Sequence, residues 1–119
     1  MGQASIVTIP HTIPDRHWAY TSPAVIEDTT AVAVKAASTG YKHRVCAIQL
    51  CNADASVDTM VQLLDHETVI WQGLIVHGQP PVAVNFDIPL VVTVSKALNV
   101  KCVTTSAEVY VNVQGFTAP

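Results

Sequence analysis

Apolar and polar residues alternate with a period of two along most of the chain after residue 16. In the stretch 57–63, Val, Thr, Val and Leu fall on one side, and three valines do the same in 109–113. Such alternation, together with many β-branched residues, is typical of strands with one buried face. No window sustains the 3.6-residue period of an amphipathic helix. The sequence therefore predicts an all-β protein.

Eight stretches carry this pattern at intervals of roughly ten residues, which is typical of a sandwich or barrel. They are HWAYT, TAVAVKA, RVCAIQLC, VDTMVQLLD, TVIWQGLIV, PVAVNFD, ALNVKCV and EVYVNVQGF. We expect an antiparallel β-sandwich, a jelly roll of about eight strands. An immunoglobulin-like sandwich is the nearest alternative, but the chain lacks its Cys…Trp…Cys spacing. TVIWQGLIV is apolar on both faces, so it should be central or covered by a neighbouring subunit.

Pro89 interrupts an apolar run, between Ile88 and Leu90. Proline cannot donate a hydrogen bond to a sheet, so it belongs at the start of a strand, at a sheet edge or in a bulge. We expect Pro89 to separate PVAVNF from LVVTV, at a corner where the chain crosses between the two sheets.

The N-terminal residues 1–15 are predicted to form an extended arm, and residues 16–119 a single β-sandwich domain. Pro10 and Pro14 fix their own φ angles and hold the preceding residues extended. Ile9 and Ile13 would be exposed on such an arm, so we expect the arm to dock on another surface unless it is a disordered tail.

Composition favours one domain that is part of a larger assembly. The chain has 119 residues, of which 50% are hydrophobic and 13% charged, with a net charge of −3. So few charged side chains cannot cover the whole surface, which favours an oligomer in which part of the surface is buried. The basic residues are scattered and form no stripe, so binding to nucleic acid or to a membrane surface is not expected.

Motifs of catalysis and metal binding are missing, so we predict no catalytic residues, no metal and no cofactor. The five histidines show no metal-ligand spacing, and no GxSxG, CxxC or phosphate-binding glycine loop occurs. Three carboxylates near one hairpin, Asp58, Asp65 and Glu67, could in principle act as a glycosidase pair, but solvated turn residues are the simpler interpretation. The cysteines, Cys46, Cys51 and Cys102, are read as small buried side chains, with the first two on opposite faces of one strand.

Two tryptophans stand out among few aromatic residues. Trp18 and Trp71 could each stack on a sugar ring, but in apolar strands they are better explained as core or interface side chains. We therefore include both as candidate interface residues, together with Ile9, Pro10, Ile13 and Pro14.

The order of several motifs resembles that of small virion proteins of tailed bacteriophages, of the jelly-roll decoration (cement) type. The motifs are a Trp-x-Tyr strand, TTAVAVKAA, an Arg-led strand ending in Asn, a V-x-L-x-D…T-V-I-W hairpin, Phe-x-x-Pro-Leu, AL-x-V and VYVNVQGF. They cover nearly all of the chain after the arm. In that family, Gly usually follows the Asp of the central hairpin. This chain has His66 there, so we expect a longer loop.

The resemblance implies a non-enzymatic capsid decoration protein that binds the major capsid protein and stabilises the assembled head. It implies a homo-oligomer, with a trimer favoured, made in the host cytoplasm and located on the capsid surface of the virion. The alternative is a tail, fibre or baseplate module that binds a host surface glycan. Such a module would use Trp71 or Tyr41 together with Asp54.

Overall fold

A computed structural model of the protein describes residues 17–26 and 29–119, which form eight β-strands. The strands are β1 (His17–Thr21), β2 (Val32–Lys35), β3 (Lys42–Asn52), β4 (Thr59–Asp65), β5 (Thr68–Ile75), β6 (Val82–Val91), β7 (Leu98–Cys102) and β8 (Val109–Ala118). Each coincides with one of the eight predicted stretches, so the all-β prediction is confirmed. The predicted arm, with Ile9, Pro10, Ile13 and Pro14, lies outside the described residues.

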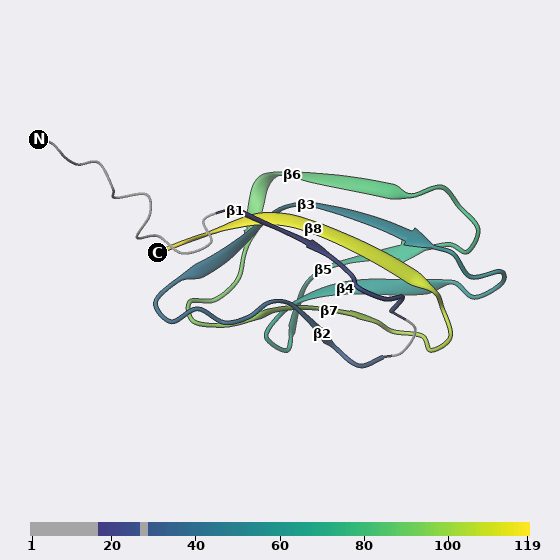
Figure 1. Ribbon diagram of the computed structural model, residues 1–119, viewed down its shortest axis with the longest axis horizontal. Helices are drawn as coiled ribbons and strands as arrows, with labels where there is room; N and C mark the ends of the chain where they lie inside the picture. The colour runs from purple at the N-terminus through teal and green to yellow at the C-terminus, as the bar shows by residue number, and fades with distance from the viewer. Residues whose placement is uncertain (1–16, 27–28) are drawn as a thin grey trace, which may run out of the picture.

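The strands form two four-stranded antiparallel sheets, one in the order β1-β8-β3-β6 (sheet A) and one in the order β2-β7-β4-β5 (sheet B). They are the upper and lower layers in Figure 1. β1 pairs with β8, β2 with β7, β3 with β6 and β4 with β5, as in one long hairpin folded at the β4–β5 turn. The contacts β3–β8 and β4–β7 appear when that hairpin is rolled up. This is the jelly-roll arrangement that we expected.

The core lies between the two sheets and is built mainly of alternate residues of the strands, with β1 and β6 contributing only partly buried side chains. In β8, Val109, Val111 and Val113 are buried, and the residues between them are at least partly exposed. Val61 and Leu63 of β4 face them from the other sheet and are fully buried. Fully burying a side chain of this size contributes about 1.5–3 kcal/mol. The predicted alternation is thus the pattern that holds the sandwich together.

A bulge in β3 changes the predicted alternation of that strand. The pairing of β3 with both of its neighbours shifts between Val45 and Ala47. As a result Val45 and Ile48, three residues apart, are both fully buried. The predicted opposite facing of Cys46 and Cys51 is therefore wrong, and both are only half-buried, whereas Cys102 is buried as expected. None of the three forms a disulfide.

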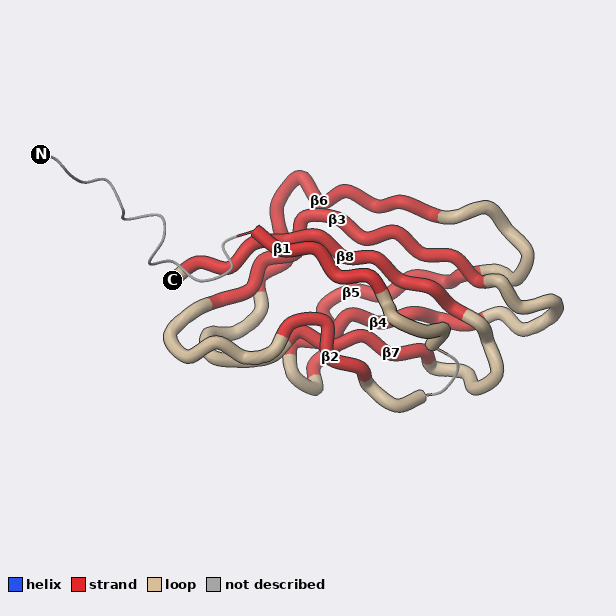
Figure 2. The backbone as a smooth tube through the Cα atoms, in the orientation of Figure 1, coloured by secondary structure: helices blue, strands red, loops and turns tan. Residues whose placement is uncertain are grey.

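The strand β6 passes through Pro89 instead of ending there. Val45 pairs with Leu90 and Ala47 with Asn85, so the residues 86–89 of β6 bulge outward opposite a single residue of β3. The strand turns towards the other sheet near its C-terminal end (Figure 2). The chain leaves the sheet only after Val91, so the predicted corner at Pro89 is wrong. The other expectation holds, because Pro89 lies in a bulge of an edge strand.

The turn between β4 and β5 is shorter than the resemblance led us to expect. Asp65 pairs directly with Thr68, which leaves a loop of only His66 and Glu67. His66 has a positive φ of 56°. Its main chain is held by two long-range hydrogen bonds: its N–H donates to the carbonyl of Ala97 at 3.0 Å, and its carbonyl accepts from Asn99 Nδ2 at 3.0 Å. These contacts replace the glycine that a tight turn usually needs.

Candidate interaction surface

Strands β5 and β6 are the edge strands of the two sheets on the same side of the sandwich, and we call this side the β5–β6 flank. The expectation that TVIWQGLIV is central is therefore wrong, and its second alternative, cover by a neighbouring subunit, stays a prediction. The opposite side, which we call the β1–β2 flank, is formed by the two other edge strands.

Large apolar side chains are exposed mainly on the β5–β6 flank. Leu74 is 61% exposed and Ile88 is 84% exposed. Of the nine large apolar side chains that are exposed in the described residues, six lie on this flank: Val69, Leu74, Val76, Val82, Ile88 and Val91. Asp87 is the only Asp, Glu, Lys or Arg in the whole sequence from Thr68 to Val91. The flank is therefore apolar and nearly uncharged, which is typical of the central part of a protein interface.

Trp71 joins the two sheets on this flank. Its ring meets that of Phe86 in β6 edge-on, with centroids 6.2 Å apart and an interplanar angle of 81°. The ring also lies across Gly73 of its own strand, where an added Cβ would come within 2.8 Å of it. Within the part of the chain that the structure describes, the indole N–H of Trp71 donates no hydrogen bond. Trp71 is thus packed on one side and retains an available donor.

Trp18, the other predicted interface tryptophan, is bound into the β1–β2 flank by polar contacts. Its Nε1–H donates to Thr117 Oγ1 at 3.1 Å. Thr117 Oγ1 lies 2.8 Å from Nδ1 of the fully buried His43, whose Nε2 lies 2.7 Å from the carbonyl of Ala36. Since a carbonyl only accepts, the Nε2 of His43 donates, and its Nδ1 accepts from Thr117. This chain of bonds joins β1, β8, β3 and the segment after β2, which gives Trp18 a role in the fold itself.

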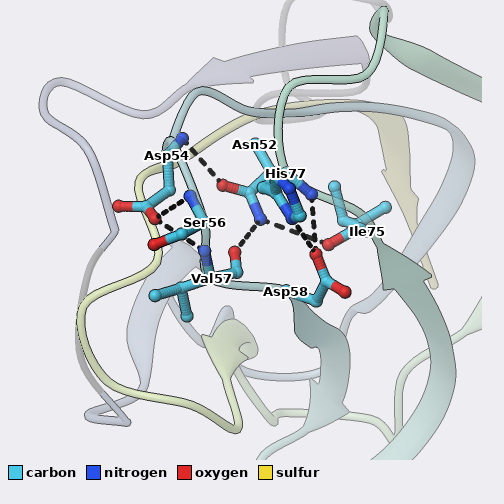
Figure 3. A network of polar contacts seen from close by, with 7 residues as sticks. All are labelled: Asn52, Asp54, Ser56, Val57, Asp58, Ile75 and His77. Atoms are coloured by element: carbon cyan, nitrogen blue, oxygen red, sulfur yellow. Dashed lines mark hydrogen bonds and ion pairs between the residues drawn. The ribbon is translucent and has the colours of Figure 1, made fainter.

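A buried amide fixes the loops at the far end of β5 (Figure 3). Asn52 Nδ2 donates to the carbonyls of Val57, at 2.8 Å, and of Ile75, at 3.2 Å. Asn52 Oδ1 accepts from the main-chain N–H of Asp54 at 3.0 Å. One side chain at the end of β3 therefore holds both the β3–β4 loop and the last residue of β5.

Two carboxylates extend this network on its exposed side. Asp58 Oδ1 accepts from the main-chain N–H of His77 at 2.9 Å and lies 2.5 Å from His77 Nδ1. These bonds, from the main chain first and then from the imidazole, lower the pKa of Asp58. Main-chain N–H groups of Ser56 and Val57 bind the carboxylate of Asp54 and lower its pKa as well.

The outer face of sheet A is uncharged over its middle, and we call this middle part the amide face. Because Ile48, Leu50, Val111 and Val113 point into the core, the residues between them lie on the outside. Gln49 and Gln114 exchange two side-chain hydrogen bonds of 2.9 Å across the strands. Strand pairing aligns two rows on this face: Thr21, Asn112, Gln49 and Ala83, and Ala19, Gln114, Ala47 and Asn85. Arg44 lies towards one end, over the ring of Phe116.

The side chains weighed for a glycosidase pair or for a glycan site do not gather at one place in the fold. Asp58 precedes β4 and pairs with His77, whereas Asp65 ends that strand and accepts from Thr93 N at 3.0 Å and Thr93 Oγ1 at 2.6 Å. Tyr41 and Asp54, weighed for a glycan site, flank the 11-residue strand β3 at opposite ends. In the described residues, no group of three or more His, Cys, Asp or Glu could hold a metal ion. Those residues also include no helix long and apolar enough to cross a membrane.

The sequence pointed to Trp71 as a candidate interface residue, but it predicted neither the β5–β6 flank nor the amide face. The amide face depends on which strands are neighbours, and no signal within one strand shows that. The low charge between Thr68 and Val91 was visible in the sequence, but its meaning depends on both strands being edges of the same flank.

No protein-family model matches the chain, and a search of curated proteins finds no relative.

Proposed function

We propose that the chain is a non-enzymatic phage structural protein that decorates the capsid and stabilises the assembled head. The single observation that carries the proposal is the amide face, a broad outer sheet surface on which two aligned rows carry amide, hydroxyl and alanine side chains and no charge. The order of sequence motifs supports the same class of protein. The partner is the major capsid protein, and the location is the outer surface of the virion.

An amide face suits permanent attachment to a protein shell. Burying a charge without a partner is costly, whereas neutral amides and hydroxyls can exchange water for hydrogen bonds to another protein. Interface centres are accordingly poor in charged residues. Tyr110, half-exposed next to Cys51 at one end of the face, adds an aromatic side chain of the kind enriched at interfaces. The mechanism is mechanical: a stiff sandwich bridges adjacent capsid subunits and resists their separation.

Binding to capsids tests the proposal directly. Heads of the phage that encodes this chain, assembled without it, are mixed with the purified protein and sedimented. We expect saturable binding in a fixed ratio to the major capsid protein and a higher temperature of capsid rupture. If the purified chain does not bind such heads at micromolar concentration, the proposal is overturned. Glycan-array binding together with a tail location in electron micrographs would establish the alternative.

Two glutamine substitutions form a matched pair for locating the contact. Gln49 lies in a cross-strand Gln–Gln pair on sheet A, and Gln62 lies in a similar pair with Gln72 on sheet B, at 3.0 Å. Gln49→Lys should weaken capsid binding by about 100-fold, because it buries an unpaired charge on the amide face. Gln62→Lys should leave binding within about twofold. Equal effects, or an effect of Gln62→Lys alone, would show that the amide face is not the contact.

A further inference from the structure

We propose that the β5–β6 flank is the surface through which two copies of this chain bind each other. This inference rests on the proposed function and deepens it by naming a surface for self-association. Because a two-fold contact closes at two copies, it assigns a dimer where the resemblance favoured a trimer. The two copies would meet along their β5 edges, so that the two B sheets become one continuous sheet. The β6 strands would then face each other across the same contact.

The free edge of β5 is suited to pairing with another strand. From Trp71 to Ile75 its register with β4 is regular, so its other edge presents an orderly row of main-chain groups. These residues include neither a charged side chain nor a proline. Proteins normally protect an edge strand with short length, charge, proline or a bulge. Along this five-residue part of β5 none of those protections is present.

The neighbouring edge of β6 is protected, which indicates which of the two strands pairs. Pro89 has no N–H to donate, and the bulge at residues 86–89 breaks the line of the edge. β6 therefore contributes side chains and not main-chain hydrogen bonds. Ile88, the most exposed of these at 84%, lies within that bulge.

The aromatic pair between the two strands supplies a centre for the contact. Trp71 and Phe86 are half-buried, and each packs against the core on its inner side. Tryptophan in the middle of an uncharged patch is the residue type that most often dominates binding energy. Its indole N–H, without an acceptor in the described part of the molecule, would find one across the interface.

A second copy fits this flank better than a charged partner does. Two nearly neutral apolar surfaces can face each other about a two-fold axis without bringing charges together, and such symmetric contacts are the commonest among oligomers. The five residues from Trp71 to Ile75 give a paired segment about 17 Å long, and exposed side chains of β6 extend the contact beyond it.

Sedimentation of the purified full-length chain, without capsids, tests this inference separately from capsid binding. Over a range from about 1 to about 200 µM, we expect the mass to rise from one copy to two or more. A monomer throughout that range overturns the inference, whether or not the protein binds capsids. Conversely, an oligomer that ignores capsids would overturn the proposed function and leave this inference standing.

Lysine substitutions locate the contact. The double variant Leu74→Lys, Ile88→Lys should raise the dissociation constant by about 100-fold, because Ile88→Lys would bury an unpaired charge in each copy and Leu74→Lys would place like charges on neighbouring strands of the joined sheet. The matched control is Val103→Lys, a similarly exposed apolar position outside the flank, which should change it less than about twofold. Both variants should unfold within about 0.5 kcal/mol of the parent, as surface changes do. Dissociation by the control alone, or equal dissociation by both, refutes the flank as the interface.

Amide hydrogen exchange separates a second copy from cover by the chain's own N-terminal residues. If a second copy pairs with β5, exchange of the outward-pointing amides between Trp71 and Ile75 should slow at least about tenfold as concentration rises. Protection that is the same at low and high concentration would mean that the chain covers its own flank, and would overturn the inference. Exchange that stays fast at every concentration would overturn it as well.

Discussion

The two flanks of the sandwich close their sheet edges in different ways. On the β1–β2 flank the edge strands have 5 and 4 residues, and β2 shifts register and ends at Lys35. On the β5–β6 flank the edge strands have 8 and 10 residues, and Asp87 is their only charged side chain. Short and charged edges resist pairing with other strands, and long uncharged ones invite it. The first flank thus has short edges joined by contacts within the chain, and the second carries the surface proposed above for association.

The two tryptophans show the same contrast. Trp18 satisfies its indole N–H within the chain, through Thr117 and His43, and lies over Gly115 of the neighbouring strand. Trp71 lies over Gly73 of its own strand, and within the described residues its N–H has no hydrogen-bond acceptor. Two residues that were equivalent in the sequence therefore have different roles, because one meets polar partners between strands and the other meets only the ring of Phe86.

The glycines beneath these rings give the largest expected difference between the flanks. An added Cβ at Gly115 would collide with the main-chain carbonyl oxygen of Arg44 and come within 2.7 Å of the Trp18 ring. A backbone atom cannot move aside, so Gly115→Ala should lower the free energy of unfolding by about 3 kcal/mol or more. At Gly73 the Cβ would meet only the Trp71 ring, at 2.8 Å, and the ring can tilt. Gly73→Ala should therefore cost about 1 kcal/mol.

Urea unfolding of both glycine variants checks this order. A midpoint shift of Gly73→Ala as large as that of Gly115→Ala would contradict the assignment of the rigid contact to the β1–β2 flank.

Phenylalanine substitutions sharpen the comparison of the tryptophans with a smaller effect. Trp18→Phe removes the donor to Thr117 from a half-buried site, so it should lower the free energy of unfolding by about 1–2 kcal/mol. Trp71→Phe removes no hydrogen bond inside the chain and should cost less than about 1 kcal/mol. Thermal unfolding at low protein concentration, where association is absent, measures both. If Trp71→Phe proves the more damaging change, the assigned roles are reversed.

The smallest expected effect concerns pH at the end of β5. Because hydrogen bonds from His77 lower the pKa of Asp58 in the folded chain, the stability they provide is present above the ordinary carboxyl pKa of about 3.9. It is lost as pH falls below that value, through the folded-state pKa. Asp58→Asn should therefore flatten the pH dependence of the unfolding temperature below about pH 4.

Asp65→Asn is the control for this pH experiment, because it alters a carboxylate at the opposite end of the same strand. The Asp65→Asn variant should still lose, at low pH, the stability that depends on Asp58. If the unfolding temperatures of the parent and of Asp58→Asn fall equally at low pH, the His77 contact contributes nothing to the pH dependence.

The strands could be predicted from the sequence because each turns one face towards the core. From Thr59 to Leu63 in β4 and along β8 the buried residues recur at every second position, and a shift by one would expose them all. The His66 turn could not be predicted, because its positive φ is held by Ala97 and Asn99, more than thirty positions away in the chain. Its stabilisation comes from tertiary contacts rather than from turn chemistry.

The bulges and the candidate surfaces were beyond prediction for a related reason. At Cys46 the register of β3 shifts relative to both adjacent strands, β6 and β8, and the bulge of β6 around Pro89 lies opposite this residue. Whether β5 is an edge or a centre depends on which strand pairs with β4, and that is decided by the rolling of the whole hairpin. Side chains at Gln49 and Asn112 become neighbours only after that rolling.

The position of β8 inside sheet A has a consequence for how the protein is made. β8 pairs with both β1 and β3, so the first and third strands to be synthesised are joined by the last. On the ribosome, β1 and one edge of β3 therefore wait without partners until residues 109–118 have emerged. Such long-range closure is intrinsically slow. A chain cut short before β8 would have no means of completing sheet A.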